Sequence, residues 1–527
     1  MAEDHAAPAG TDEMNGAESL VRTLLGSGVD TCFTNPGTSE MHFVAALDHV
    51  PGMRSILTLF EGVATGAADG YYRMAGRPAS TLLHLGPGLA NGLANLHNAK
   101  KGGSGVVNIV GEHAPSHIAL DAPLTSDIEG IAGPVSHWVK TSHAARTVGA
   151  DAAQAVQAAR TAPGQIATLI LPSETAWTQG GAVAFAEAPP APAMPDADAL
   201  AKAAEALDGP GSLLLLGGGA LTAENLETAG RIAARTGCAI LSEWSNARME
   251  RGAGRVFVGR VPYPIDIAIK VLEAFDRIVL VGARAPIGFF AYPGKPAVLT
   301  RDDARIVPLA GAGDDLTATL DTLCGRLGAT DTPPAHVAER NAPATPTGPA
   351  DADTIAAVLG QMIPENAIVV DESITTGRAF GPATAGAAPH TWLNNCGGSI
   401  GYSLPAAVGA AVACPDRPVL ALTGDGSAMY TVQAIWTMAR EALNITMVIF
   451  ANRSYQILRG ELTNVGVGNA GPRAIDMLSL DRPAINWVDM ARSMGAEASA
   501  VSTAEALSEA LAAGFATPGP VLIEVEM

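Results

Sequence analysis

The stretch Leu422–Asn452, LTGDGSAMYTVQAIWTMAREALNITMVIFAN, decides the fold that we expect for this chain. Its first residue, Leu422, closes the apolar run 419–422, and a second apolar run occupies Ile445–Phe450. A tight turn at 424–427 and a helix-like segment lie between the two runs. Because parallel strands are joined through a crossover helix, this pattern predicts a βαβ unit.

Two side chains with oxygen ligands stand at the ends of these runs, Asp425 and Asn452. Neighbouring parallel strands bring such side chains to one edge of the sheet, where ligands of open α/β sheets bind. A carboxylate and an amide without Cys or His beside them suit Mg²⁺, which keeps phosphate oxygens as further ligands. Gly424 and Gly426 let backbone N–H groups approach a phosphate closely. The sequence therefore predicts a magnesium–diphosphate site.

Strands and helices alternate along the rest of the chain as well. Apolar runs that we expect to form strands occupy 30–34, 79–83, 106–110 and 166–171, then 213–216, 239–241, 277–281 and 305–309. This alternation predicts an α/β protein with three doubly wound parallel-sheet domains. Stretches rich in Pro and Ala at 187–195 and 341–349 divide the chain into domains at 14–185, 196–335 and 350–527. We expect Gly86-Pro87-Gly88 to form a turn after the strand at 79–83.

Composition narrows the classes of function. With 527 residues, of which 48% are hydrophobic and 16% charged, the chain is too long for one core. Its net charge of −20 argues against nucleic acid and anionic membranes as partners. No apolar run reaches the roughly 18 residues of a membrane helix. Five scattered cysteines without CxxC spacing and an acidic, polar N-terminus favour a cytoplasmic protein.

Further motifs make the chain similar to thiamine-diphosphate-dependent enzymes. GDGS at 424–427, followed by Asn452, resembles the cofactor fingerprint of that family, and LTLFEGVATGAADGYYRMAG at 57–76 resembles its activating segment. NPGT at 35–38, HLGPG at 84–88, DESITTGRAF at 371–380 and GGSIGYSLPAAVGAA at 397–411 extend the resemblance over the whole chain. It is strongest to the branch of benzoylformate decarboxylase and acetolactate synthase. It implies pyrimidine-binding, central and diphosphate-binding domains, with sites between the subunits of a homodimer or homotetramer.

The resemblance implies thiamine diphosphate and Mg²⁺ as cofactors. Glu61 corresponds to the glutamate that activates the aminopyrimidine, and its apolar neighbours would keep a shared proton available. Asp425, Asn452 and the backbone carbonyl of Ser454 correspond to the metal ligands. Other implied cofactor contacts are Asn35, Pro36, Asn91, Ser373, Thr375, Gly424, Gly426, Ser427, Tyr455 and Ile400, the last as the apolar wedge under the cofactor. Taken singly, Glu61 could be a helix N-terminal glutamate and Asp425 a turn residue.

The substrate side follows the same resemblance. His84 matches an active-site histidine of benzoylformate decarboxylase, and imidazole titrates in the useful range. Thr38 stands where that enzyme has a serine on the substrate carboxylate, so the hydroxyl is kept and a methyl group is added. Phe289 and Phe290 replace a second catalytic histidine. With Ile457 and Leu458, these two residues are expected to shape the substrate pocket, while His113 and His117 are an open alternative as a proton relay.

The expected reaction is decarboxylation of a 2-keto acid to an enamine, followed by carboligation as in acetolactate synthase. The loss of a proton donor at Phe289 and Phe290 favours this outcome over simple decarboxylation to an aldehyde, which is the alternative. A non-catalytic relative that only binds the cofactor is a more remote alternative. A nucleotide-dependent oxidoreductase is disfavoured because Gly217-Gly218-Gly219 lacks the G-x-G-x-x-G spacing. We also expect no FAD, because the flavin-contacting loops of acetolactate synthases are missing.

Overall fold

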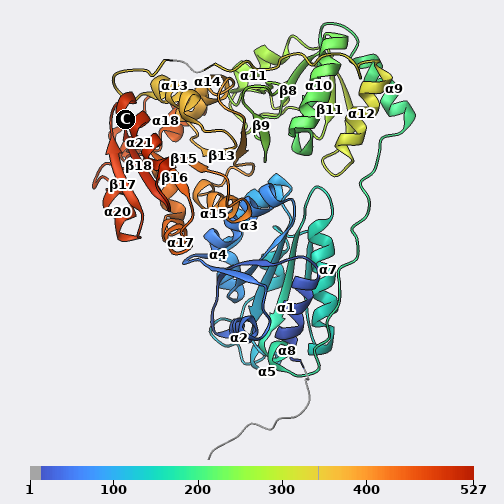
Figure 1. Ribbon diagram of the computed structural model, residues 1–527, viewed down its shortest axis with the longest axis vertical. Helices are drawn as coiled ribbons and strands as arrows, with labels where there is room; N and C mark the ends of the chain where they lie inside the picture. The colour runs from blue at the N-terminus through green and yellow to red at the C-terminus, as the bar shows by residue number, and fades with distance from the viewer. Residues whose placement is uncertain (1–13, 342–343) are drawn as a thin grey trace, which may run out of the picture.

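The computed structural model describes residues 14–341 and 344–527, so two residues of the second linker lie outside the described part. Within it, three sheets of mainly parallel strands are covered by helices (Figure 1). This confirms the predicted α/β class with three parallel sheets. No helix in the described ranges is long and apolar enough to span a membrane.

The N-terminal sheet is entirely parallel and has the strand order β2-β1-β3-β4-β6-β5. Its strands are β1 (Thr31–Asn35), β2 (Arg54–Leu57), β3 (Ala79–Leu83), β4 (Val106–Glu112), β5 (Trp138–Thr141) and β6 (Ile166–Pro172). The helices of this region are α1 (Gly16–Gly26), α2 (Met41–His49), α3 (Glu61–Ala75), α4 (Leu85–Gly102), α5 (Pro115–Ile118), α6 (Ile128–Ala132), α7 (Val148–Arg160) and α8 (Ser173–Trp177). The carboxyl ends of β1 and β3 lie side by side and carry Asn35 and His84.

The prediction that Gly86-Pro87-Gly88 forms a loop-like turn is wrong, because these residues lie in the first helical turn of α4. A proline is tolerated there, since the first N–H groups of a helix have no intrahelical partner. The two glycines serve close packing: a Cβ at Gly86 would overlap Ser126, and one at Gly88 would lie 3.2 Å from Glu61 Oε1.

The central sheet is also parallel, with the order β10-β8-β7-β11-β12. It contains β7 (Ser212–Leu216), β8 (Ala239–Ser242), β10 (Gly259–Arg260), β11 (Arg277–Val281) and β12 (Arg305–Ala310), with α9 (Ala197–Ala206), α10 (Ala223–Thr236), α11 (Ile265–Leu272) and α12 (Leu316–Arg326). Strand β9 (Met249–Arg251) leaves this sheet and pairs antiparallel with β14 of the C-terminal sheet. The central region is thereby tied to its neighbour by main-chain pairing.

The C-terminal sheet has the order β17-β18-β16-β15-β13-β14-β9. Its own strands are β13 (Ile368–Glu372), β14 (His390–Asn394), β15 (Val419–Gly424), β16 (Ile445–Ala451), β17 (Glu497–Val501) and β18 (Val521–Glu526). Its helices are α13 (Ala352–Met362), α14 (Phe380–Ala383), α15 (Ser403–Ala413), α16 (Asp425–Ala428), α17 (Ala434–Arg440), α18 (Gln456–Asn464), α19 (Pro472–Asp476), α20 (Trp487–Ser493) and α21 (Ala504–Ala516). The βαβ unit predicted at 419–452 is present, with β15 and β16 parallel neighbours.

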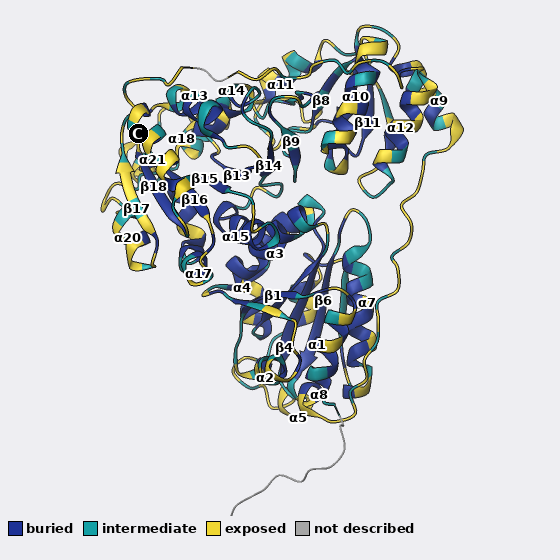
Figure 2. Cartoon of the chain, viewed as in Figure 1, coloured by how far each residue is buried: buried dark blue, intermediate teal, exposed yellow. Residues whose placement is uncertain are grey.

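Helices α3 and α15 join the N-terminal and C-terminal regions through one continuous apolar core (Figure 2). Glycines allow their backbones to touch, because a Cβ at Gly409 would overlap the Ala67 carbonyl and one at Gly70 would overlap the Ala406 carbonyl. The start of α3 carries Glu61, and the start of α15 follows the loop with Ile400. This packing therefore fixes two predicted site elements relative to each other.

Candidate active site

The predicted diphosphate site is a cleft at the carboxyl edge of the C-terminal sheet. Gly424 at the end of β15 lies opposite Phe450 of β16, so Asp425 and Asn452 leave the sheet side by side. The empty space of the cleft, together with the open solvent at its mouth, is about 390 Å³. Its lining consists of Glu372, Ser373, Ile374, Thr375, Thr376, Gly424, Asp425, Gly426, Ser427, Asn452, Ser454, Tyr455, Gln456 and Ile457. All three predicted metal ligands and most predicted diphosphate contacts thus share one cleft.

Asp425 is held by the backbone around it. Its Oδ1 accepts from the N–H of Gly426 at 2.9 Å, and its Oδ2 accepts from the N–H of Arg453 at 2.8 Å. Arg453 adopts a left-handed φ of 53°, and the next N–H, that of Ser454, donates to Asn452 Oδ1 at 3.0 Å. Burial raises the pKa of Asp425 above its ordinary value, while the two backbone hydrogen bonds lower it. A cation in the cleft would relieve the cost of this buried carboxylate.

The donor set of the cleft fits a hard cation and a phosphate. Among the described residues, no three His, Cys, Asp or Glu side chains gather, so a metal here would rely on amide and carbonyl oxygens beside Asp425. Space above Gly424 is open, with no atom within 4 Å of a Cβ built there. A Cβ at Gly426 would lie 2.6 Å from the ring of Tyr455, so only glycine fits beneath that side chain.

Glu61 lies at the start of α3 and is only 6% exposed. Asn35, at the end of β1, donates from Nδ2 to Oε1 at 3.1 Å. Asn91, on α4, donates from Nδ2 to Oε2 at 2.9 Å. Three residues that we expected at the cofactor ring are therefore in direct contact, and both carboxylate oxygens of Glu61 are oriented.

His84 has a partner that the sequence analysis missed, Glu40. His84 Nδ1 lies 2.9 Å from Glu40 Oε2, which also accepts from the N–H of Gly37 at 2.8 Å. Burial raises the pKa of Glu40, although the charge of His84 acts against this. Its other oxygen has no hydrogen-bond partner among residues 14–341 and 344–527 and lies against Gly111, where a Cβ would overlap it. Glu40 lies two residues after Thr38, and the motif that contains Thr38, NPGT, begins at the end of a strand beside β3. This position was the signal for Glu40 that the sequence offered.

Pro36 and Thr38 are the chain neighbours of Gly37, whose N–H donates to Glu40. Thr38 is exposed at the start of the 3-10 helix η1 (Thr38–Glu40), and Pro36 is half-buried.

His113 and His117 follow β4, with ring centroids 5.5 Å apart. They lie against each other, and His113 follows Gly111 by two residues on the same sheet edge.

Phe289 and Phe290 belong to an aromatic cluster of the central region. Phe289 packs edge-on against Trp244 and Phe290, with centroid distances of 4.9 Å and 4.6 Å, and the cluster continues to Tyr263 and Tyr292. The Phe289 ring also covers Gly398, where a Cβ would lie 2.9 Å from it. Gly398 stands two residues before Ile400. Ile457 lines the cleft, whereas Leu458 on α18 is exposed.

The predicted residues thus form two groups within one chain. The cleft lining comes entirely from the C-terminal region, and neither Glu61 nor His84 belongs to it in the described structure. Ile400 lies in the loop between them, where Asn95 of α4 donates to the carbonyl of the next residue, Gly401, at 3.2 Å.

Comparison with known proteins assigns both groups to one family. A model described as "Thiamine pyrophosphate enzyme, N-terminal TPP binding domain" matches residues 14–130, and its "C-terminal TPP binding domain" counterpart matches 380–525. The "Putative acetolactate synthase large subunit IlvX" of Mycobacterium tuberculosis is 51% identical over 97% of this chain and 99% of that relative. The chain belongs to the thiamine-diphosphate enzyme family. The resemblance stated from the motifs is confirmed.

Other relatives of this family are decarboxylases. The "Benzoylformate decarboxylase" of Pseudomonas aeruginosa is 30% identical over 94% of this chain and 96% of that protein. The solved structure of a thiamine diphosphate-dependent 4-hydroxybenzoylformate decarboxylase from Rhodococcus jostii superposes with a TM-score of 0.83 at 25% identity, covering 98% of this chain and 99% of the other. The chain is therefore a thiamine-diphosphate-dependent 2-keto acid enzyme of the decarboxylase and carboligase family.

Glu372 lines the cleft and, after Glu40, is a second residue that the sequence analysis passed over. It ends β13 and is 4% exposed. It accepts from the backbone N–H groups of Tyr402 and Ser403 and from the side chain of Asn395. It lies within the family motif at 371–380, but only its tertiary partners distinguish it from Asp371 beside it.

Proposed function

We propose that this protein decarboxylates a 2-keto acid and joins the remaining acyl unit to a second carbonyl compound. The observation that carries the proposal is Phe289, which lies against Gly398 near Ile400. An apolar side chain replaces a proton donor there, so the acyl unit escapes rapid protonation and can react with an acceptor. The relative with 51% identity, named as an acetolactate synthase subunit, supports the same choice.

The proposed cofactors are thiamine diphosphate and Mg²⁺. Asp425, Asn452 and the Ser454 carbonyl would hold the metal ion, because these oxygens line one cleft. The diphosphate contacts would come from the residues of the same cleft, namely Ser373, Thr375, Gly424, Gly426, Ser427 and Tyr455. Ile400 would support the cofactor ring from below.

When bound, thiamine diphosphate supplies the electron sink for loss of CO₂. Glu61 would exchange the proton that activation of the cofactor needs, and Asn35 and Asn91 orient both of its oxygens. His84 has its Nδ1 engaged by Glu40, which leaves Nε2 to exchange a proton with the substrate oxygen. Thr38, which is exposed and follows Gly37 in the chain, would contact the substrate carboxylate. Phe289, Phe290, Ile457 and Leu458 would exclude water from the acyl unit.

We propose that sites form between two subunits of a homodimer or homotetramer in the cytoplasm. The separation of the Glu61 group from the cleft within one chain supports this. The proposed pyrimidine-binding, central and diphosphate-binding domains remain 14–185, 196–335 and 350–527.

We further propose that the central domain carries no FAD. Its glycine loop after β7 faces Glu243, whose Oε1 accepts from the N–H of Arg284 at 2.7 Å. A Cβ at Gly217 would lie 2.8 Å from the other oxygen of Glu243. A carboxylate there repels the diphosphate that a flavin dinucleotide would place on such a loop. Purified protein should be colourless, and yellow protein would contradict this.

Simple decarboxylation to an aldehyde is the second candidate. The His84–Glu40 pair favours it, because it can deliver a proton, and two of the relatives are named as decarboxylases. Purified protein with thiamine diphosphate and Mg²⁺ should be incubated with pyruvate and benzoylformate separately. Formation of CO₂ with a coupled product would support carboligation, and formation of CO₂ with free aldehyde would support the second candidate. If no product forms from either substrate, this result would support a non-catalytic relative.

Glu61→Gln tests the role of the carboxylate. We expect turnover to fall by about 100-fold or more, because an amide cannot exchange the activating proton. Thiamine diphosphate should still bind, as measured by calorimetry. Asp425→Asn is the matched variant in the cleft and should weaken cofactor binding instead. Near-wild-type turnover in Glu61→Gln would exclude the proposed activation.

A further inference from the structure

The segment Asn394–Ser403 connects β14 to α15 and carries Ile400; we call it the wedge segment. Gly398 and Gly401 adopt left-handed φ angles of 78° and 90°. Glycines in such conformations give a loop little stiffness of its own. The wedge segment therefore depends on its surroundings for a fixed position.

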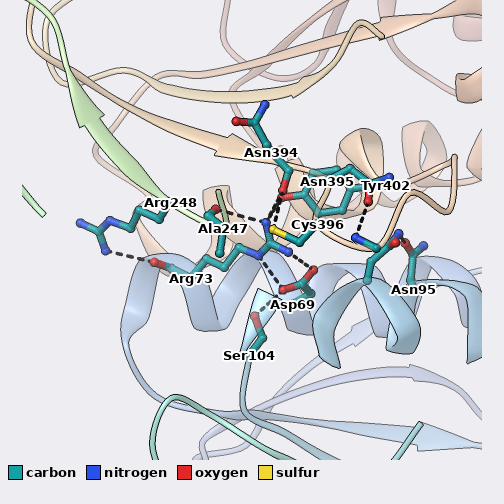
Figure 3. A network of polar contacts seen from close by, with 12 residues as sticks. Asp69, Arg73, Asn95, Ser104, Ala247, Arg248, Asn394, Asn395, Cys396 and Tyr402 are labelled. Atoms are coloured by element: carbon teal, nitrogen blue, oxygen red, sulfur yellow. Dashed lines mark hydrogen bonds and ion pairs between the residues drawn. The ribbon is translucent and has the colours of Figure 1, made fainter. Parts of the chain in front are cut away.

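Arg73 of α3 holds the wedge segment from one side (Figure 3). Its Nη1 donates to the Asn394 carbonyl at 2.6 Å and to the Tyr402 hydroxyl at 2.7 Å, which lie near the two ends of the segment. The guanidinium carbon also lies 4.9 Å from the centroid of the Tyr402 ring. The same Nη1 reaches the Ala247 carbonyl at 3.1 Å, so Arg73 contacts all three regions of the chain.

Asp69 keeps this arginine charged and aimed. Its two oxygens accept from Nε and Nη2 of Arg73 at 2.7 Å and 2.8 Å, and Ser104 donates to the same carboxylate at 2.5 Å. Burial lowers the pKa of Arg73, but Asp69, Tyr402 and Cys396 together raise it by more, so the pKa lies above the ordinary value. A bidentate pair of this kind fixes the plane of the guanidinium.

Glu372, which bears a carboxyl group, holds the wedge segment by accepting hydrogen bonds from its N–H groups. Its carboxylate accepts from the N–H of Tyr402 at 3.0 Å and of Ser403 at 3.2 Å, which are the first free N–H groups of α15. It also accepts from Asn395 Nδ2 at 3.2 Å, near the other end of the segment. The carboxyl oxygens face the N-terminus of α15, and the buried site excludes competing water.

We propose that Arg73 and Glu372 are positioning residues that hold the wedge segment, and with it Ile400, in place before the cofactor binds. Arg73 takes the carbonyl and hydroxyl oxygens of the segment, while the carboxyl group of Glu372 takes its N–H groups. Each end of the segment is thus held by both residues. The claim that this positioning serves cofactor binding rests on the proposed function. The claim that Arg73 and Glu372 hold the wedge segment in place does not.

Hydrogen–deuterium exchange of the cofactor-free, full-length protein tests the hold. Arg73→Lys and Glu372→Gln should each speed exchange of peptides covering 394–403 by about 10-fold or more. Arg417→Lys is the matched arginine control, because Arg417 donates to the Asn366 and Ala367 carbonyls at the other end of β13. Asp151→Asn is the matched carboxylate control, since Asp151 is buried and accepts from Ser142 away from the segment. Both controls should leave 394–403 unchanged.

Unchanged exchange in the two test variants, or equal acceleration in the controls, would overturn the hold. If Arg73→Lys does not fold, the test uses Glu372→Gln and Asn395→Ala, since the Asn395 side chain is only half-buried. Affinity for thiamine diphosphate tests the link: Kd should rise about 10-fold in the variants, because the competent segment is less populated. Faster exchange with unchanged Kd would refute the positioning role. Failure of the wild type to bind the cofactor would instead refute the proposed function, and the exchange data would still judge the hold.

Discussion

Glu61, His84 and Asp425 all owe their geometry to partners on other elements. Asn35 and Asn91 orient Glu61, Glu40 orients His84, and the Arg453 backbone orients Asp425. In the proposed function, the side chain would supply the chemistry at each position. Its neighbours orient the group that would present the proton or charge.

Glu40→Gln should therefore impair the reaction through His84. An amide cannot balance a positive imidazole, so we expect kcat/KM to fall by about 10-fold to 100-fold and its pH dependence to change shape. Steady-state kinetics across pH measures both. His49→Asn removes the contact with Glu18, a surface His–Glu pair 3.5 Å apart, and should leave both unchanged. An unaltered pH profile in Glu40→Gln would show that Glu40 does not act through His84.

Glu372 should make stability depend on pH. Burial raises its pKa to about 7 from an ordinary 4.5, against the lowering effect of its N–H donors. The folded protein then keeps a proton that the unfolded chain has lost, so this contribution to stability is fully present below about pH 4.5 and is lost as pH rises through 7. The free energy of unfolding of the cofactor-free wild type should fall over that window relative to Glu372→Gln. Parallel curves from urea denaturation would contradict it.

Among the elements, the contact between α3 and α15 matters most, because Glu61 begins one helix and the wedge segment leads into the other. The helices approach so closely that glycines are required where their backbones meet. The contact between α3 and α15 therefore makes the N-terminal and C-terminal regions of one chain a single packed unit.

Gly409→Ala should break this unit. Its Cβ would overlap the Ala67 carbonyl, and overpacking of a core costs about 1–3 kcal/mol of stability. We expect a lower midpoint in urea denaturation and weaker cofactor binding. Gly460→Ala on exposed α18 is the matched control, because no atom lies within 4 Å of its Cβ and alanine favours helix. Equal stability of Gly409→Ala and wild type would refute the close contact.

For the molecule as a whole, the arrangement of two separate site groups in one chain has a direct test. If sites lie between subunits, co-expressed Glu61→Gln and Asp425→Asn should regain activity that neither variant has alone. Each mixed dimer then contains one site with both wild-type groups. Light scattering should show a dimer or tetramer, and a monomer, or no regain of activity, would exclude shared sites.

The sequence by itself determined the fold class, the family and the βαβ unit at 419–452. Apolar runs, glycines and strand-end ligands are local features, and they report which elements form. The family motifs also named Glu61, Asp425 and Asn452 before their positions were known. The first turn of α4 was missed because Gly86-Pro87-Gly88 is equally compatible with a loop, and only packing against Ser126 and Glu61 selects the helix.

Only the tertiary structure decided which residues act together. Glu372 ends a strand and Glu40 ends a short 3-10 helix, and neither position by itself reveals that Glu40 meets His84 and Glu372 meets Tyr402. Arg73 and Asn394 are far apart along the chain and become partners only when α3 packs on α15. Hydrogen bonds of this kind join segments through packing, and the pattern of a single segment carries no record of its partner. The cleft with Asp425 and Asn452 was predictable because one local βαβ unit builds its centre, whereas the hold on the wedge segment is a property of the folded chain.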